Sequence, residues 1–451
     1  MLRILSYFEI NAYRQGVKRL SIILSMSALA VAILFLSKAG FGQIQSAQQT
    51  APPAVNSAAV RDPVVSSAAL PSDIMKLRRE GCEALYNLDP ATAVEKFEEI
   101  RKRLPHHPAG DLYMATAIWL THLSKTRRLQ TSLYGSGSSF YAGAGSSKED
   151  TEGDAVDINV DRAFRERMAQ AKTKALALVA KNKNDPDALY YLGSYYGVMA
   201  GYEASTARKF FSAMRNGSRC VDAHEKVLKL KPDYYDAYLS IGVYDYIVGN
   251  LPFSYKFLAT MVGVRGNKKR GITRLQTIID KDASTADDAR VLLVAIFRNE
   301  KRYDDSLSLL EQLSSKYPNG YLLKLERASL LMTLNRPSEA YALFEGLLND
   351  PAAASALDLI NYQYAEALAR NKEYKRAAET FIAVHQVQGG DVNLATVSRL
   401  RAGQMYDLAG DRQEAIQQYN AVLARPNVYD TKQQATDGLN KPFIVKEKKS
   451  D

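Results

Sequence analysis

The segment SLSLLEQLSSKYP, residues 306–318, carries a spacing that returns along most of the chain. Ser306, Leu310 and Leu313 lie four and three residues apart, which places them on one face of a helix, and Pro318 follows where a helix would end. The same spacing begins again 34 residues later at Ala340. It begins also at Ala93, Cys220, Ala377 and Ala415. Copies in phase predict a helical repeat rather than a set of unrelated helices.

A second small residue lies 12 positions before several of these copies, at Gly81, Ala328, Ala365 and Gly403. A small side chain there would let two antiparallel helices approach closely, and the large apolar residue one turn further on would fill the space beside it. One such helix pair cannot bury its apolar face alone, so successive pairs must stack on one another. The sequence therefore predicts an all-α chain built from helix pairs.

These residues resemble the tetratricopeptide repeat, whose 34-residue unit has small residues where two helices cross and proline at the exit. The resemblance implies a right-handed solenoid of antiparallel helix pairs. We expect seven to eight pairs between Ser72 and about Pro426, so the resemblance covers about four-fifths of the chain. It also implies a binding scaffold, because solenoids of this kind present extended concave surfaces to their partners.

Two copies of the repeat are interrupted. Residues 132–160 include a Gly/Ser-rich run, and they predict a flexible insertion before a helix that starts near Arg162. Residues 202–218 add about 15 positions between two repeat helices, and we expect them to lengthen a helix.

The first 42 residues have a different composition from the repeat region. Four cations precede an uncharged stretch over residues 20–36, and the small-x-small pattern of a cleavage site follows and ends at Gly42. This pattern predicts a secretory signal peptide, and the alternative is an uncleaved membrane anchor, since the stretch is nearly long enough to span a bilayer. Either interpretation predicts export to the cell envelope. The protein would then be soluble in the periplasm or tethered to the inner membrane through residues 20–36.

The rest of the chain divides by composition. Residues 43–71 are rich in Ala, Ser, Gln and Pro and predict a disordered linker. We expect the repeat domain over residues 72–430 and a C-terminal tail over residues 431–451.

Charge and metal-ligand spacing exclude several classes of protein. The net charge is +10, of which the leader contributes +4, and the remainder is spread too thinly to predict a nucleic-acid partner. The two cysteines are too few for a disulfide-built scaffold. Histidine and cysteine do not occur at zinc-site spacing, so we expect neither a metal nor a cofactor.

The segment VGVRGNKKRG, residues 262–271, resembles a phosphate-binding loop only in its glycines and cations. It lacks the Gly-Lys-Ser/Thr of a P-loop, and Gly271 occupies the small position of another repeat. If Asn267 caps the helix, then Lys268, Lys269 and Arg270 fill the first turn, where cations oppose the helix dipole. We expect these three to be solvated, with an anion or acidic partner as the alternative. Changing them to glutamine should then leave stability unchanged or slightly higher.

Residues 249–275 carry a second, local resemblance. They are similar to a passage in a eukaryotic family of tetratricopeptide proteins linked to mitochondrial outer membranes and lipid droplets. The matching residues are Leu251, Pro252, Lys256, Gly263, Gly266 and Gly271, whereas Phe253 stands where that family tends to have proline. The family offers no catalytic residues to transfer, so the resemblance supports a non-enzymatic function.

The first helix of each repeat should line the concave groove. Positions three before and one after its small residue are expected to face inward, and tyrosine there provides contact area with little rotamer entropy to lose. The groove contacts predicted in this way are Tyr190, Ser194, Tyr362, Glu366, Arg401 and Gln404.

The function predicted from the sequence is a non-enzymatic scaffold of the cell envelope that holds a protein or peptide in its groove. Two alternatives remain open. The chain could be an accessory or substrate-binding part of an envelope enzyme, or a structural component that associates with itself. The sequence predicts no catalytic residues and leaves the oligomeric state open.

Overall fold

The computed structural model describes residues 68–126, 129, 157–207, 209–251 and 266–445. The predicted leader, nearly all of the predicted linker, and residues 132–156 of the predicted insertion lie outside this part of the chain. Within it the protein is all-α, with 17 α-helices and two short 3₁₀ segments, Tyr235–Ala237 and Pro351–Ala356.

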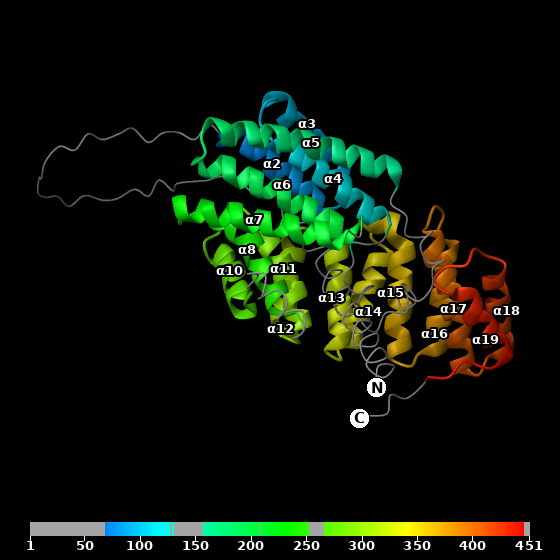
Figure 1. Ribbon diagram of the computed structural model, residues 1–451. Coiled ribbons are helices and arrows are strands. Elements are labelled where there is room, and N and C mark those ends of the chain that lie inside the picture. The colour runs from blue at the N-terminus through cyan, green and yellow to red at the C-terminus, as the bar shows by residue number, and fades with distance from the viewer. Residues whose placement is uncertain (1–67, 127–128, 130–156, 208, 252–265, 446–451) are drawn as a thin grey trace, which may run out of the picture.

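Sixteen of these helices form eight consecutive antiparallel pairs, as the repeat spacing predicts. The pairs are α2 (Ser72–Tyr86) with α3 (Pro90–Arg103), α4 (Ala109–Lys125) with α5 (Ile158–Lys181), α6 (Pro186–Ser205) with α7 (Phe210–Leu230), α8 (Tyr238–Gly249) with α10 (Lys268–Asp280), α11 (Ala286–Asn299) with α12 (Tyr303–Lys316), α13 (Tyr321–Thr333) with α14 (Pro337–Leu348), α15 (Leu357–Arg370) with α16 (Tyr374–Gln386), and α17 (Val392–Ala409) with α18 (Arg412–Leu423). Figure 1 shows the pairs following one another through the molecule.

The small residues of the repeat lie where the two helices of a pair cross. A Cβ atom added to Gly81 would lie 2.3 Å from the ring of Phe97, and one added to Gly403 would lie 2.7 Å from the ring of Tyr419. Separations this short are not tolerated, so each glycine is required by the aromatic ring that fills the space beside it. The predicted repeat phase is confirmed at these crossings.

The interruptions affect helix lengths. The helices α6 and α7 have 20 and 21 residues, because the extra positions after Gly201 extend both of them, as expected. The helix α5 begins at Ile158, four residues earlier than predicted, with the side chain of Asp157 as its N-terminal cap.

The repeat domain continues one helix beyond its predicted end. Helix α19 (Thr431–Asn440) lies in the segment expected to be a tail, and it packs on α17 and α18. A Cβ atom at Gly438 would lie 2.5 Å from the Tyr419 ring, so this glycine closes over the last pair as Gly403 does from the other side. The helix shields the apolar end of the solenoid, which a repeat array requires of its final element.

Two large buried clusters form the core, and helix α11 belongs to both. One cluster reaches from Leu70 to Phe297, and the other reaches from Val291 to Ala435. Along α11, Leu292 and Leu293 face the first cluster and Val294 faces the second. This helix has an almost continuous apolar sequence because it is covered on both sides.

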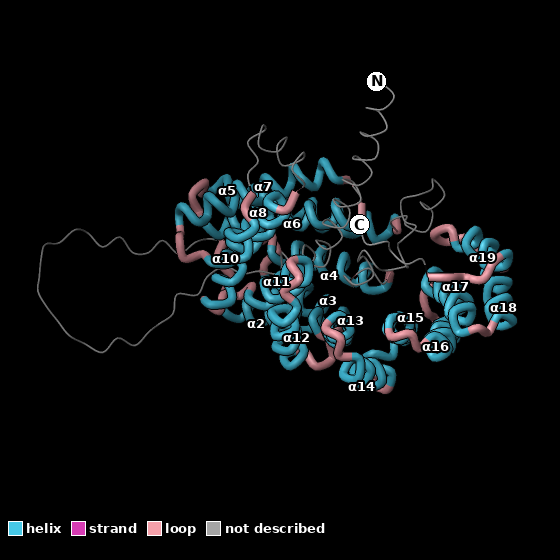
Figure 2. Tube along the Cα trace, turned by 90° about the horizontal axis from the view of Figure 1, so that it is seen from below, coloured by secondary structure: helices cyan, strands magenta, loops and turns pink. Residues whose placement is uncertain are grey.

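The first helix pair returns to contact the middle of the chain. The ring of Tyr86, at the end of α2, stacks on Tyr317 with ring centroids 4.5 Å apart, and the Tyr86 hydroxyl donates to Asp288 of α11. Next to it the backbone N–H of Asn319 donates to the Asn87 side chain at 3.2 Å. Figure 2 shows α2 and α3 beside α12 and α13. We call this contact between the first and the fifth and sixth pairs the junction.

The helices that the structure describes were compared with the requirements for crossing a membrane. None of them combines the length and the apolar run needed to cross a bilayer.

Candidate functional site

Two cavities lie at the junction, on either side of Tyr86. One is apolar and has a volume of about 490 Å³, and the other is polar and has a volume of about 820 Å³. Tyr86 lines both of them. Cavities of this size accept a side chain or a small molecule, so the junction is the candidate functional site.

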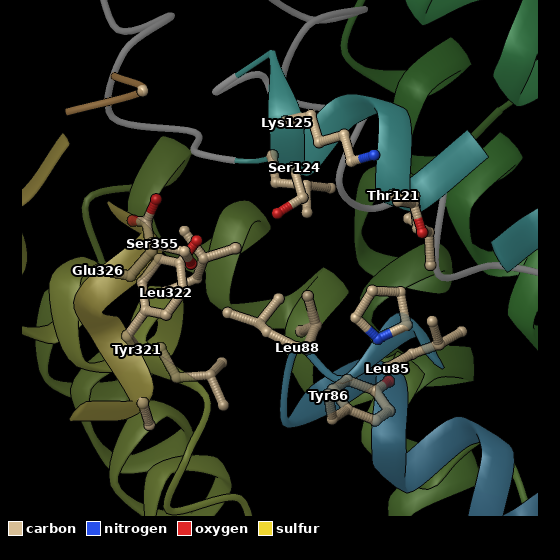
Figure 3. Close-up of a pocket in the computed structure, with 17 residues that line it drawn as sticks. Leu85, Tyr86, Leu88, Thr121, Ser124, Lys125, Tyr321, Leu322, Glu326 and Ser355 are labelled. Atoms are coloured by element: carbon tan, nitrogen blue, oxygen red, sulfur yellow. The ribbon is translucent and has the colours of Figure 1, made fainter. Parts of the chain in front are cut away.

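The apolar cavity lies between the ends of α2 and α4 and the start of α13. Figure 3 shows Leu85 and Leu88 facing Leu322 across it, with Ser124 and Lys125 at another edge. Leu322 contacts both buried clusters of the core. The cavity is therefore a gap between the two halves of the core, with leucine side chains for walls and a polar rim.

The polar cavity lies between α2, the segment that precedes α8, the start of α11 and the end of α12. Arg78 and Cys82 line it from α2, and Asp236 and Asp288 line it from the opposite side. Burial raises the pKa of Asp288 to about 8, although Tyr86 donates a hydrogen bond to it, and burial also raises the pKa of Asp236. At neutral pH the Asp288 carboxyl is therefore mostly protonated.

Arg78 was not among the predicted site residues, although the spacing rule contained the signal. It lies three positions before Gly81, which is the position that Tyr190 holds before Gly193 and Tyr362 before Ala365. In a run of charged residues such as LRRE it reads as a surface residue, whereas the structure leaves it only 4% exposed.

Tyr190 and Ser194, two of the predicted groove contacts, are both buried, and Tyr190 belongs to a small separate cluster with Val227 and Tyr234. Tyr190 has no exposed surface, and its ring stacks on His224 with centroids 4.9 Å apart. The hydroxyls of both residues have no hydrogen-bond partner among the described residues. Tyr190 does not face an open groove, because the rings of His224, on the other helix of its own pair, and Tyr234 cover it. A ligand contact by them stays a prediction that requires the position to be uncovered.

The other four predicted groove contacts lie together, on α15 and α17. Arg401 forms an ion pair with Glu366 at 2.9 Å and donates to the Gln404 side chain at 2.8 Å. Tyr362 is buried, with its ring edge-on to Phe381. The structure therefore divides the six predicted residues into two separate groups, and neither group lines the cavities at the junction. Binding by the second group also stays a prediction.

The three predicted anion contacts occupy the first turn of α10, and the side chain of Asn267 caps that helix as expected. Two of the cations have acidic partners within the protein. Lys268 lies 2.6 Å from a carboxylate oxygen of Glu300, and Arg270 donates two hydrogen bonds to Asp245, at 2.7 and 2.5 Å. Lys269 is exposed. An external anion stays a prediction, and it would compete with these carboxylates.

Gly271 is a crossing residue, as predicted. A Cβ atom there would lie 2.5 Å from the carbonyl oxygen of Gly242 on α8. Most of the other residues that match in this segment, among them Pro252, Lys256 and Gly263, lie outside the described residues.

A cysteine and a histidine meet at another repeat position, but their environment is that of a core. The sulfur of Cys220 lies 3.8 Å from Nδ1 of His224, which lies 2.5 Å from the Ser240 hydroxyl. Burial raises the pKa of Cys220 to about 12 and lowers that of His224 to about 4. Both are therefore neutral at pH 7, and a neutral thiol is a poor nucleophile. Within the described ranges, no group of three or more metal-ligating side chains could hold a metal ion.

The comparisons with known proteins agree with the repeat. A family model described as Iml2/Tetratricopeptide repeat protein 39 matches residues 237–388, from the 3₁₀ turn before α8 to just past the end of α16. This confirms the local resemblance of residues 249–275, which lies mostly within that range. No curated protein matches the chain in sequence.

Three solved structures illustrate the similarity. A tetratricopeptide repeat protein from Parabacteroides merdae is 13% identical, with 73% of this chain and 99% of that chain covered and a TM-score of 0.32. Yeast Tom70 is 13% identical, with 81% and 88% covered and a TM-score of 0.37. Human IFIT1, in a dimer with PPP-AAAA, is 13% identical, with 79% and 96% covered and a TM-score of 0.31.

Proposed function

Because this chain is a tetratricopeptide repeat protein, we propose that it is a scaffold that binds a protein partner, and that the partner inserts apolar side chains into the apolar cavity. The observation that carries the proposal is the cavity of about 490 Å³ between Leu85, Leu88 and Leu322. Apolar pockets with a polar rim are the usual anchor points of a peptide or helix.

The position of the cavity supports this function. It lies where the two halves of the core face each other without filling the space between them. A leucine or phenylalanine from a partner would bury its surface against side chains that already line a cavity, so little of the protein would need to rearrange. Ser124, Lys125 and Ser355 at the edge could then bond the partner's backbone.

Site-specific photocrosslinking tests the proposal. A photoreactive phenylalanine derivative at the exposed Ser355 should capture a defined partner segment in cells, whereas the same group at the exposed Leu176 on α5 should not. Leu323→Asp places a charge in the cavity wall and should abolish the capture, and Leu176→Asp is the matched control. The same products from both positions, or capture that survives Leu323→Asp, would contradict a partner bound in this cavity.

We propose further that the protein works in the cell envelope. This rests on the leader alone, with its cations, its uncharged stretch and its cleavage pattern. N-terminal sequencing of the protein from fractionated cells tests it. A mature chain that begins at Gln43 supports a secreted form, and an intact chain in the membrane fraction supports the anchor. An intact chain in the cytosolic fraction would refute the envelope location.

A further inference from the structure

Two arginines bonded to neutral groups lie near the end of the repeat array, where Figure 1 shows α16, α17 and α18 together and away from α2. Arg399, on α17, donates to the side-chain oxygen of Gln418 at 2.8 Å, and another of its nitrogens lies 2.5 Å from Nε2 of His385. Arg425, just after α18, donates to the hydroxyl of Thr396 at 3.0 Å. An amide, a hydroxyl and an imidazole nitrogen that accepts a proton carry no negative charge, so these bonds neutralise neither guanidinium. We call Arg399 and Arg425 the arginine pair.

The two positive charges of the arginine pair lie close together. Thr396 precedes Arg399 by three residues on α17, so both side chains lie on the same face of that helix, and Arg425 bonds to the first of them. Burial, and after it the charge of Arg425, lowers the pKa of Arg399. Among the described residues no acidic group offsets these two effects. Both arginines are half-buried, so a solute can reach them.

Other arginines of the same helices do have acidic partners. Arg401, two positions after Arg399, lies 2.9 Å from Glu366, and the charge and hydrogen bond of that carboxylate outweigh burial and raise the pKa of Arg401. Arg412, at the start of α18, lies 2.9 Å from Asp407. The arginine pair therefore differs from its neighbours, because within the described ranges its positive charge has no counter-ion from the protein.

The arginine pair also has hydrogen-bond donors that remain available. Nε is the nitrogen through which Arg425 bonds to Thr396. Its two terminal nitrogens, which carry four N–H groups, make no hydrogen bond within the part of the chain that the structure describes. A guanidinium with a free fork of this kind matches an anion that accepts two parallel hydrogen bonds.

We propose that the arginine pair binds a dianionic phosphate monoester, independently of a partner in the apolar cavity. One dianion balances both positive charges, whereas a carboxylate balances one and leaves the other beside it. The three terminal oxygens of a phosphate monoester can also accept hydrogen bonds from two guanidiniums at once. The phosphate can belong to a phosphorylated side chain of a protein partner or to a small phosphate compound in solution.

Calorimetric titration of the purified full-length chain, at low ionic strength and pH 8, tests the ligand class, because the phosphate is then a dianion. The peptide acetyl-Ala-phosphoserine-Ala-amide should bind at least about tenfold more tightly than the same peptide with glutamate in place of phosphoserine. Inorganic phosphate distinguishes the two sources. Tighter binding of the phosphopeptide than of inorganic phosphate assigns the site to a partner's side chain, and inorganic phosphate that binds as tightly assigns it to a small phosphate compound. Equal binding of the phosphoserine and glutamate peptides, or binding of neither phosphate ligand, would overturn the proposal.

Substitutions locate the binding on the arginine pair. Arg425→Gln should weaken phosphate binding at least about tenfold, and Arg425→Lys, which keeps the charge and loses the fork, should give an intermediate affinity. Arg399→Gln is a second variant at the same site and should weaken binding as strongly. Arg336→Gln is the matched control, because it removes one positive charge from an exposed arginine that is paired with Glu339, and it should change the affinity by less than about twofold.

The melting temperature of each variant shows whether it is folded before it is titrated. Folded Arg425→Gln that binds phosphate as tightly as wild type would overturn the proposal. So would an equal loss of binding in Arg336→Gln, since the phosphate would then respond to the net charge of the protein and not to the arginine pair.

Discussion

The hydrogen bonds of the buried His107 side chain require one protonation state of its imidazole ring. Its Nε2 lies 2.8 Å from the carbonyl oxygen of Ala68, and its Nδ1 accepts the backbone N–H of Ala109 at 3.1 Å. This arrangement requires a neutral ring with the proton on Nε2, because a second proton on Nδ1 would face the Ala109 N–H. Burial lowers the pKa of His107 to about 4.

This residue predicts that stability falls at acidic pH. The folded pKa lies below the unfolded value of about 6.5, so the unfolded chain binds more protons between pH 6.5 and 4 and stability decreases as the pH falls through that window. Between pH 7 and pH 5 the loss from His107 should be about 2 kcal/mol. Asp288, whose pKa is raised, acts in the opposite direction, but it is common to all variants and cancels in the comparison.

Urea unfolding at pH 7 and pH 5 measures the effect. His107→Gln should lose less stability than wild type between the two pH values, whereas His106→Gln, at the exposed neighbouring position, should lose as much as wild type. The same loss in all three proteins would show that His107 is not the titrating group.

At the scale of the element, α10 reverses an expectation drawn from the sequence. Three cations in its first turn oppose the helix dipole, so the sequence predicted that changing them to glutamine would leave stability unchanged or slightly higher. In the structure Asp245 is buried and receives hydrogen bonds from both Arg270 and Arg274. The buried carboxylate on α8 therefore outweighs the dipole, because an unpaired buried charge costs more than an exposed cation at a helix start.

The prediction for this element distinguishes Arg270 from Lys269. Arg270→Gln should lower the free energy of unfolding by about 1–2 kcal/mol, toward the lower end because Arg270 is half-exposed and Arg274 remains. Lys269→Gln, one residue away and exposed, should change it by less than about 0.5 kcal/mol or raise it slightly. Urea midpoints of the two variants provide the test, and equal midpoints would favour the dipole over the ion pair.

The elements were predictable because their signal is local and repeated. A glycine followed at a fixed distance by a large ring, as in Gly81 and Phe97, specifies a helix crossing whatever the rest of the chain does. Helix α19 was missed because Gly438 contacts Tyr419 only after the last pair has formed. Tyr190 and Tyr362 were placed in the groove because the spacing fixes which side of a helix they occupy but not whether other side chains, here His224 and Phe381, cover that side.

Apart from Arg78, whose position the spacing rule contained, the candidate site was not predictable from spacing, since it depends on the curvature of the whole array. Small rotations between successive pairs add up over five repeats and bring Tyr86 against Tyr317 and Asp288, more than 200 positions away in the sequence. No local sequence pattern predicts the total rotation over five repeats. Both cavities acquire part of their lining from distant repeats through this contact.

At the scale of the molecule, the junction changes how the chain should unfold. In an open solenoid each repeat contacts only its neighbours, and stability is a sum of nearest-neighbour terms. Here the first pair is also held by the fifth and sixth, through the stacked tyrosines and the hydrogen bond to Asp288. Opening the first pair therefore exposes a buried carboxyl and the walls of both cavities, so α2 and α3 should be protected as strongly as the middle of the chain.

Tyr86→Ala should remove that protection. It deletes the ring stack and leaves Asp288 without its hydroxyl donor, so hydrogen exchange over residues 72–103 should accelerate at least about tenfold while exchange over α15–α18 stays unchanged. Tyr86→Phe keeps the ring and should give an intermediate rate. Tyr341→Ala is the matched control, because Tyr341 also combines a ring contact, to Tyr364, with a hydroxyl bond, to Glu373, but between neighbouring pairs. If Tyr86→Ala leaves residues 72–103 as protected as in wild type, the first pair is held by its neighbours alone, and the cavities at the junction do not depend on this contact.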